Sequence, residues 1–114
     1  MIIAGTTDFA ARGASGDSSI NVFLPMSDYG KYTKVKAEFV YREASDIVGV
    51  PDLYSSTTNL NFNSLSNHLS GSMGANIDIT SITNSGKDYL LIWHWYGFSS
   101  SGSRKSFIVK YTFT

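Results

Sequence analysis

Two side chains in the last quarter of the chain, His94 and Tyr96, are of types that suit ligand recognition. They stand two positions apart in the apolar run 89–96, so in an extended strand they share one face. An imidazole donates and accepts hydrogen bonds, a phenol ring combines a flat apolar surface with a hydroxyl, and Arg104 follows in a Ser-rich segment. We predict a recognition site in which Tyr96 stacks on a ligand while His94 and Arg104 donate hydrogen bonds. The alternative is a surface or subunit-interface histidine beside a basic hairpin tip.

Three amides recur at alternate positions, Asn59, Asn61 and Asn63, and would line one face of a strand. An amide both donates and accepts, which matches the vicinal hydroxyls of a sugar. Tyr54 belongs to a polar segment that we expect to be a loop, and it would add an aromatic rim if that loop folds over the sheet. Asn61 and Tyr54 are therefore further candidate ligand contacts. The alternative for the amides is a solvated edge strand.

The two tryptophans, Trp93 and Trp95, occupy the opposite face of the run 89–96. Burying one such side chain removes ~150–250 Å² from water, which at ~25 cal/mol/Å² stabilises a fold by at most about 4–6 kcal/mol. Core placement is therefore the simplest interpretation, and we predict that Trp93 faces the core. The other interpretation, open above all for Trp95, is an aromatic platform for sugar rings or for the side chains of a partner protein.

Motifs for catalysis and metal binding do not occur in the sequence. The histidines His68 and His94 lack metal-ligand spacing, and there is no nucleophile elbow, phosphate loop or His-Glu-x-x-His motif. We therefore expect no enzyme activity, no metal and no cofactor. A small glycan-processing enzyme stays open as an alternative, because carboxylates such as Asp52 and Asp78 could meet in space and a sequence does not give their separation.

The composition argues against two classes of partner. Nine basic and nine acidic residues cancel, charged residues make up 16% of the 114, and the sequence pI is near 6.7. Such a chain has no field to attract phosphate backbones or anionic lipid, so nucleic acid and membranes are not expected as partners. Cysteine is absent, which leaves the burial of apolar side chains as the visible source of stability. The first residues lack the basic and apolar regions of a signal peptide.

Alternation of apolar and polar residues predicts an all-β fold. Strands are expected at 20–24, 35–42, 59–63, 75–80, 89–96 and 107–114, with one helical turn within 43–49, a loop over 52–58 and a flexible arm over 1–18. The last two strands are expected to form a hairpin with its tip at 99–105. The expected core residues are Val35, Ala37, Phe39, Tyr41, Trp93, Val109, Tyr111 and Phe113. Short strands joined by polar turns, without crossover helices, indicate a single antiparallel β-sandwich domain over 1–114 with little or no helix.

The segments 32–39, 77–82 and 89–93 resemble the strand pattern of jelly-roll modules, which are found in phage tail and virion proteins and in carbohydrate-binding domains. The resemblance implies a jelly-roll-like sandwich. It also implies a non-catalytic module, often homo-oligomeric, on a virion or an extracellular surface. Its ligand would be a glycan or a neighbouring protein.

These residues and this resemblance together predict a recognition module that binds a carbohydrate or a protein receptor as part of a phage or other virion assembly. The alternative is a small structural virion protein, such as a capsid cement or a tail component. Such a protein would act through contacts with other virion subunits and not through a ligand site.

Overall fold

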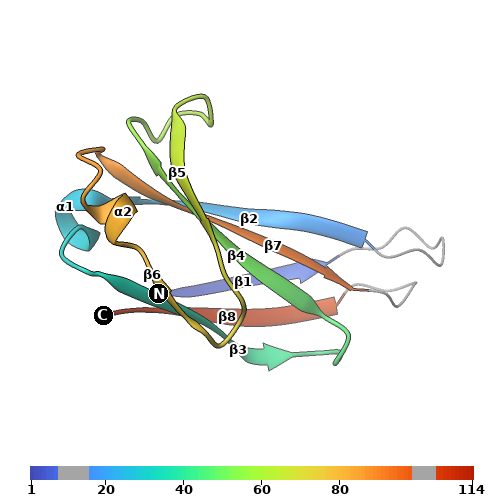
Figure 1. Ribbon diagram of the computed structural model, residues 1–114. Helices are drawn as coiled ribbons and strands as arrows, with labels where there is room; N and C mark the ends of the chain where they lie inside the picture. The colour runs from blue at the N-terminus through green and yellow to red at the C-terminus, as the bar shows by residue number, and fades with distance from the viewer. Residues whose placement is uncertain (8–15, 99–104) are drawn as a thin grey trace.

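Eight β-strands make up most of the part of the chain that the structure, a computed structural model, describes: residues 1–7, 16–98 and 105–114 (Figure 1). The strands are β1 (Ile2–Thr7), β2 (Gly16–Pro25), β3 (Lys34–Arg42), β4 (Val48–Ser56), β5 (Leu65–Ser70), β6 (Asn76–Asp78), β7 (Tyr89–Phe98) and β8 (Lys105–Phe113). Two single-turn helices, α1 (Met26–Tyr29) and α2 (Thr80–Thr83), lie together at one end of the molecule.

The strands form two antiparallel sheets that pack face to face. The first sheet has the order β1-β8-β3-β6, and the second has the order β2-β7-β4-β5. Polar turns and β-branched or aromatic strand residues produce this arrangement, as the composition predicts. The predicted all-β sandwich with little helix is confirmed.

The strand pairs are nested: β1 pairs with β8, β2 with β7, β3 with β6 and β4 with β5. Successive pairs alternate between the two sheets, so the chain resembles one long hairpin rolled into a sandwich. Two further pairings, β3 with β8 and β4 with β7, close each sheet across the roll. This is the jelly-roll arrangement of eight strands. The two ends of the chain consequently lie side by side, with the Met1 nitrogen 3.2 Å from the Tyr111 carbonyl oxygen (Figure 1).

The core lies between the sheets and follows the strand alternation. Of the predicted core residues, Val35, Ala37, Val109 and Tyr111 are fully buried. Phe39 and Phe113 are partly buried and pack against that cluster. The expected inward phase of β3 and β8 is therefore confirmed.

Two predicted core residues are not in the core. Tyr41 is 49% exposed, because the pairing of β3 with β8 shifts by one residue between Phe39 and Tyr41. A β-bulge of this kind reverses the side-chain phase for the rest of the strand. Trp93 lies on the outer face of the second sheet, since the residues of β7 that point inward are Leu90, Ile92, His94 and Tyr96.

The predicted hairpin between the last two strands is wrong. β7 and β8 belong to different sheets, and each is an inner strand with two neighbours. β7 and β8 are both strongly apolar, and an inner position in a sheet buries such a strand most completely. The nested pairing gives each of them two neighbouring strands from distant parts of the chain.

Several segments between residues 43 and 70 also differ from expectation. The predicted loop at 52–58 is mostly β4, and the predicted strand at 59–63 is the loop after it. β4 accommodates Pro51 because β5 pairs only from Asp52 onward, so the missing N–H falls beyond the end of that ladder. Residues 43–47 form a turn without a helix.

The N-terminal segment and the expected strand at 75–80 also need correction. Ile2–Thr7 forms β1 and pairs along its whole length with β8, where a flexible arm was expected over 1–18. Residues 8–15 of that arm lie outside the described part of the chain. Only Asn76–Asp78 of the expected strand is β6, and α2 follows it.

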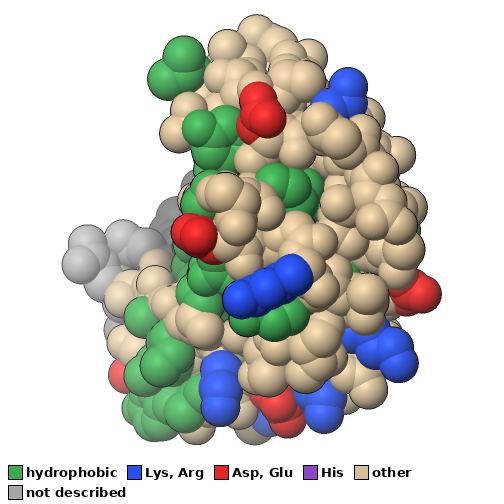
Figure 2. Space-filling model, turned by 90° about the vertical axis from the view of Figure 1, so that its left-hand side faces the viewer, with side chains coloured by type: hydrophobic (Ala, Val, Ile, Leu, Met, Phe, Trp, Pro, Cys, Tyr) green, Lys and Arg blue, Asp and Glu red, His purple; other side chains and the backbone are tan. Residues whose placement is uncertain are grey.

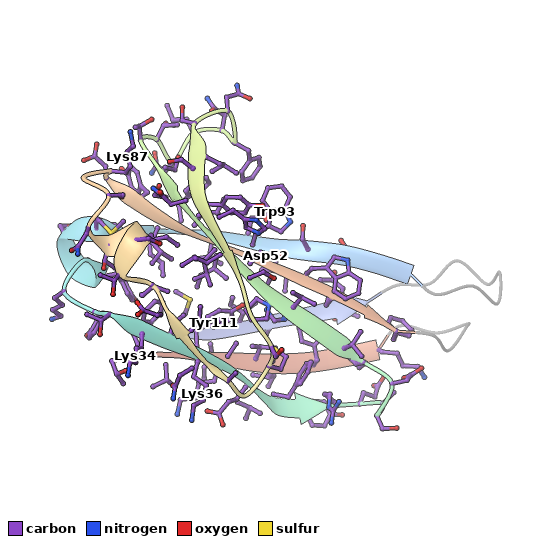
Figure 3. The ribbon with its side chains drawn as sticks, viewed as in Figure 1. Lys34, Lys36, Asp52, Lys87, Trp93 and Tyr111 are labelled. Carbon is purple, nitrogen blue, oxygen red and sulfur yellow. The ribbon has the colours of Figure 1, made fainter. Side chains whose placement is uncertain are left out.

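One buried hydrogen bond connects the sheets through the core. His94 Nδ1 of β7 lies 2.6 Å from the Tyr111 hydroxyl of β8, and both side chains are buried. Tyr111 is labelled in Figure 3. His94 Nε2 has no hydrogen-bond partner within the described structure. It faces Gly49, where an added Cβ would lie 2.8 Å away, so only glycine leaves room for the ring.

Removing the Tyr111 hydroxyl should destabilise the sandwich, because it leaves the His94 ring unpaired inside the core. We expect Tyr111→Phe to lower the free energy of unfolding by about 1–3 kcal/mol, the usual penalty for a buried polar group without its partner. Urea denaturation measures the change. Tyr41→Phe, at an exposed position of the first sheet, is the matched control and should change it by less than about 0.5 kcal/mol. Equal effects of the two substitutions would contradict the role of the buried pair.

Candidate ligand-binding site

The outer face of the second sheet carries both tryptophans. Inward placement of His94 turns Trp93 and Trp95 outward, since neighbouring residues of a strand point to opposite faces. Trp93 pairs with Asn21 of β2 on one side and with Asp52 of β4 on the other. The indole ring of Trp93 therefore stands in the middle of the sheet, beside an amide and a carboxylate.

A continuous row of rings crosses this face. We call it the ring row, and its members in order are Tyr89, Phe23, Phe62, Trp93, Tyr54 and His68. The centroids of consecutive rings are 4.5 to 6.3 Å apart, the range in which aromatic pairs attract each other. Leu91, fully buried but outside the core between the sheets, points to the same face as Trp93 and is covered there. The second sheet thus has a small apolar layer on its outer side.

A hydrogen-bonded pair lies at one end of the ring row. His68 Nε2 of β5 is 3.0 Å from Asp52 Oδ1 of β4, and the His68 ring stacks on Tyr54 with centroids 4.5 Å apart. The side chains of His68 and Asp52 are 51% and 23% exposed, so a ligand in solution can reach them. Partial burial and the Asp52 charge raise the pKa of Tyr54, which keeps its hydroxyl protonated as a donor. Donors and acceptors therefore stand directly beside an aromatic surface.

The loop between β4 and β5 holds Phe62 over the sheet. Side chains of the loop bond to its own backbone: Thr58 Oγ1 accepts from the Leu60 amide at 3.1 Å, and Asn61 Oδ1 accepts from the Asn63 amide at 3.0 Å. These short-range bonds stabilise a turn in which Phe62 reaches Phe23 and Trp93. Leu60 of the same loop is 86% exposed.

The two sheets differ in charge. None of the residues that the structure assigns to β2, β4, β5 or β7 is Lys or Arg, whereas the strands of the first sheet contain five: Lys34, Lys36, Arg42, Lys105 and Lys110. Figure 2, which views the end of the molecule where α1 and α2 lie, shows Lys and Arg side chains gathered in the lower half, over the first sheet. Lys34 and Lys36 lie there in Figure 3, away from Trp93 and Asp52. The outer face of the second sheet is therefore aromatic and amide-rich, and Asp52 is the acidic side chain described on it.

The predicted site residues do not meet in one place. His94 and Tyr96 were expected to face a ligand, and this orientation is wrong because both side chains are buried in the core. Tyr54 belongs to the ring row, and Asn61 lies in the loop that carries Phe62. Arg104 and the rest of the Ser-rich segment up to it lie outside the described residues. Ligand contact by Tyr54 and Asn61 stays a prediction.

Four residues of the candidate site were not singled out from the sequence. Phe23 and Asn21 share a face of β2, and alternation placed them together without indicating which residues of other elements lie beside them. Phe62 was assigned to the expected strand at 59–63, and His68 lay between two expected strands. A histidine stacked on Tyr54 and bonded to Asp52 requires the pairing of β4 with β5, which no local pattern encodes.

Groups for metal binding or catalysis are few in the described part of the chain. No cluster of three or more His, Cys, Asp or Glu side chains occurs there. Asp52 and Asp78, considered as a carboxylate pair, belong to opposite sheets. Asp78 instead accepts hydrogen bonds from the Thr80 hydroxyl and amide at the start of α2, and these bonds lower the pKa of its carboxyl. Among the described helices, none is long and apolar enough to cross a bilayer.

Comparisons with known proteins return no similarity: no protein-family model matches the chain, and neither does a curated protein or a solved structure. The function must therefore be inferred from the geometry of the second sheet.

Burial of His94 predicts a pH dependence of stability. Removal from water lowers its pKa from 6.5 to about 4, against a smaller opposite effect of the Asp52 charge. Between these values the unfolded chain binds a proton that the folded protein does not, so stability falls as the pH drops from about 6.5 to about 4. At 1.36 kcal/mol per pKa unit the loss is about 3 kcal/mol.

Urea denaturation over this pH range should show the loss in the natural protein and not in His94→Gln, whose side chain carries no titrating group. All other titrating groups are present in both proteins, so the difference between the two curves reports His94 together with its coupling to Asp52. Parallel curves would show that His94 does not titrate as a buried group.

Proposed function

We propose that this protein is a non-catalytic recognition module that binds a carbohydrate on the outer face of its second sheet. The observation that carries the proposal is the ring row with the Asp52–His68 pair at its end. An array of rings on a rigid sheet offers flat apolar surface to the C–H faces of sugars. The adjoining carboxylate, imidazole and phenol supply the acceptors and donors that hydroxyl groups need.

The rigidity of the face supports this proposal. Trp93 and Tyr54 project from inner strands of the sheet, where backbone pairing on both sides fixes their position. Little side-chain freedom remains to be lost when a ligand binds, and such pre-organisation improves affinity. A site on strands also keeps its ring spacing constant, which suits a repeating ligand.

The fold is compatible with this function without requiring it. Jelly rolls occur in lectin domains and in viral capsids, and one fold hosts unrelated functions. We propose a place on a virion or another extracellular surface, where a glycan would be met, as the part of a larger assembly that contacts a receptor.

A second candidate function, a structural virion subunit, is favoured by a different observation. Ile2 and Val40 on the first sheet are 64% and 58% exposed, and Leu60 beside the second sheet is 86% exposed. Exposed apolar side chains on both faces suit contacts with neighbouring subunits. Light scattering together with a glycan array distinguishes the candidates, because a structural subunit assembles in solution and binds no glycan, whereas a recognition module binds a glycan in whichever oligomeric state it has.

Truncating Trp93 should weaken glycan binding while the fold persists. We expect Trp93→Ala to reduce affinity for a bound glycan at least about tenfold, because a central aromatic side chain typically carries 2 kcal/mol or more of binding energy. A glycan array identifies the ligand, and calorimetry then measures the dissociation constant. Tyr41→Ala, an exposed tyrosine of the first sheet, is the matched control and should bind normally.

Two results would contradict the proposal: no binding of the natural protein to any glycan, or equal losses in Trp93→Ala and Tyr41→Ala. Trp93→Ala opens space above Leu91, so its folding is checked by the unfolding transition. Tyr54→Ala, at the edge of the ring row, is the second variant if Trp93→Ala does not fold.

A further inference from the structure

The carboxylate of Asp52 stands beside aromatic rings on the sheet whose described strands hold no Lys or Arg. It pairs across the sheet with Trp93 and precedes Tyr54 by two residues, so all three side chains share the outer face. The ring centroids of Trp93 and Tyr54 are 6.2 Å apart with an interplanar angle of 60°, so the two rings meet edge-on beside Asp52. The side chain of Asp52 is 23% exposed, so its charge is only partly hydrated.

The charge of Asp52 is not balanced by a permanent cation of its own sheet. The strands β2, β4, β5 and β7, as described, hold no Lys or Arg. His68 bonds to Oδ1 and adds positive charge only when protonated. The Asp52 charge acts on Tyr54, where it adds to burial in raising the pKa, and on His94, where it opposes in part the lowering of the pKa by burial. A cation that approaches Asp52 therefore meets a negative charge that no Lys or Arg of the described strands of this sheet offsets.

Aromatic faces reinforce the same preference. The ring quadrupole attracts a cation placed over the face of Trp or Tyr, most strongly over Trp. A carboxylate beside such rings combines charge attraction with cation–π contacts, the combination that selects ammonium groups. An anionic sugar would instead be repelled by Asp52 at short range.

We propose that the ligand of this site is an amino sugar whose nitrogen is positively charged, bound with the nitrogen at Asp52 beside Trp93 and with neighbouring sugar rings along the ring row. This inference rests on the proposed carbohydrate-binding function and names the class of ligand. Neutral glycans of the same backbone bind more weakly, and acidic ones bind least. The charge on the nitrogen, and not a particular pattern of hydroxyls, provides the selection.

Matched oligosaccharides of one length and backbone test the proposal at neutral pH. One carries N-acetyl groups and is neutral, one carries N-trimethyl groups and is cationic at every pH, and one carries carboxylates. We expect calorimetry to give an affinity roughly tenfold higher for the N-trimethylated ligand than for the N-acetylated one, the gain of a charge-assisted cation–π contact. Choline serves as the same cation without a sugar and should bind much more weakly than the N-trimethylated oligosaccharide.

Asp52→Asn removes the charge and keeps an oxygen that can accept from His68. The preference for the cationic ligand should fall to near one in this variant, while binding of the N-acetylated ligand persists. Glu38→Gln removes a charge from the first sheet and is the matched control, in which the preference should be unchanged.

The outcomes separate the two proposals. Binding of the neutral oligosaccharide without a preference for the cationic one overturns the amino-sugar inference and leaves the carbohydrate-binding function standing. A preference that survives in Asp52→Asn also overturns it, as does choline binding as tight as that of the oligosaccharide. Absence of binding to every oligosaccharide overturns both proposals.

Discussion

The hydrogen bond between His94 and Tyr111 decides which face of β7 turns inward, and the outer surface of the second sheet depends on that choice. Both faces of β7 are apolar enough to be buried, so burial of apolar area alone does not fix the phase. A buried imidazole is costly unless it has a partner, and Tyr111 on the facing sheet supplies one. With His94 inside, period-two alternation places Trp93 and Trp95 outside.

This polar pair also shows how closely the core is fitted around one side chain. The ring of His94 touches the position where any residue but glycine at 49 would place a Cβ, and its second nitrogen faces that backbone. Desolvation keeps the ring neutral, so the sandwich tolerates it only in one protonation state. The core thus holds a titratable group that serves packing and not ligand binding.

Much of the fold could be predicted from the sequence, because alternation in 20–24, 35–42 and 107–113 is local information. The failures lie where partners are distant. The residues of β4 include a glycine and a proline and therefore resemble a loop in sequence. They form a strand because β7 pairs with them along the whole of β4. The Asn-rich segment at 59–63 alternates like a strand, yet its side chains bond to their own backbone and hold a turn instead.

The candidate site was less predictable than the fold for the same reason. Tyr54 and Asn61 were found by residue type, whereas Asp52, His68 and Phe62 come together only through the pairing of β4 with β5 and the loop between them. The choice of His94 and Tyr96 failed because a strand with two apolar faces gives no local signal of its phase. The informative signal would have been Tyr111, which lies 17 positions after His94 and supplies a hydrogen-bond partner for its imidazole.

The nested pairing of strands has a consequence for synthesis and folding. β7 and β8 are inner strands of the two sheets, so a growing chain cannot complete either sheet until residues 89–113 have left the ribosome. Until then β1 and β3 lack the strand that separates them, and β2 and β4 lack theirs. The nascent chain therefore exposes unpaired, aromatic strand edges, and the long loops that must close make folding slow. Cells that produce this protein must protect those edges for longer than they would in a fold built from consecutive hairpins.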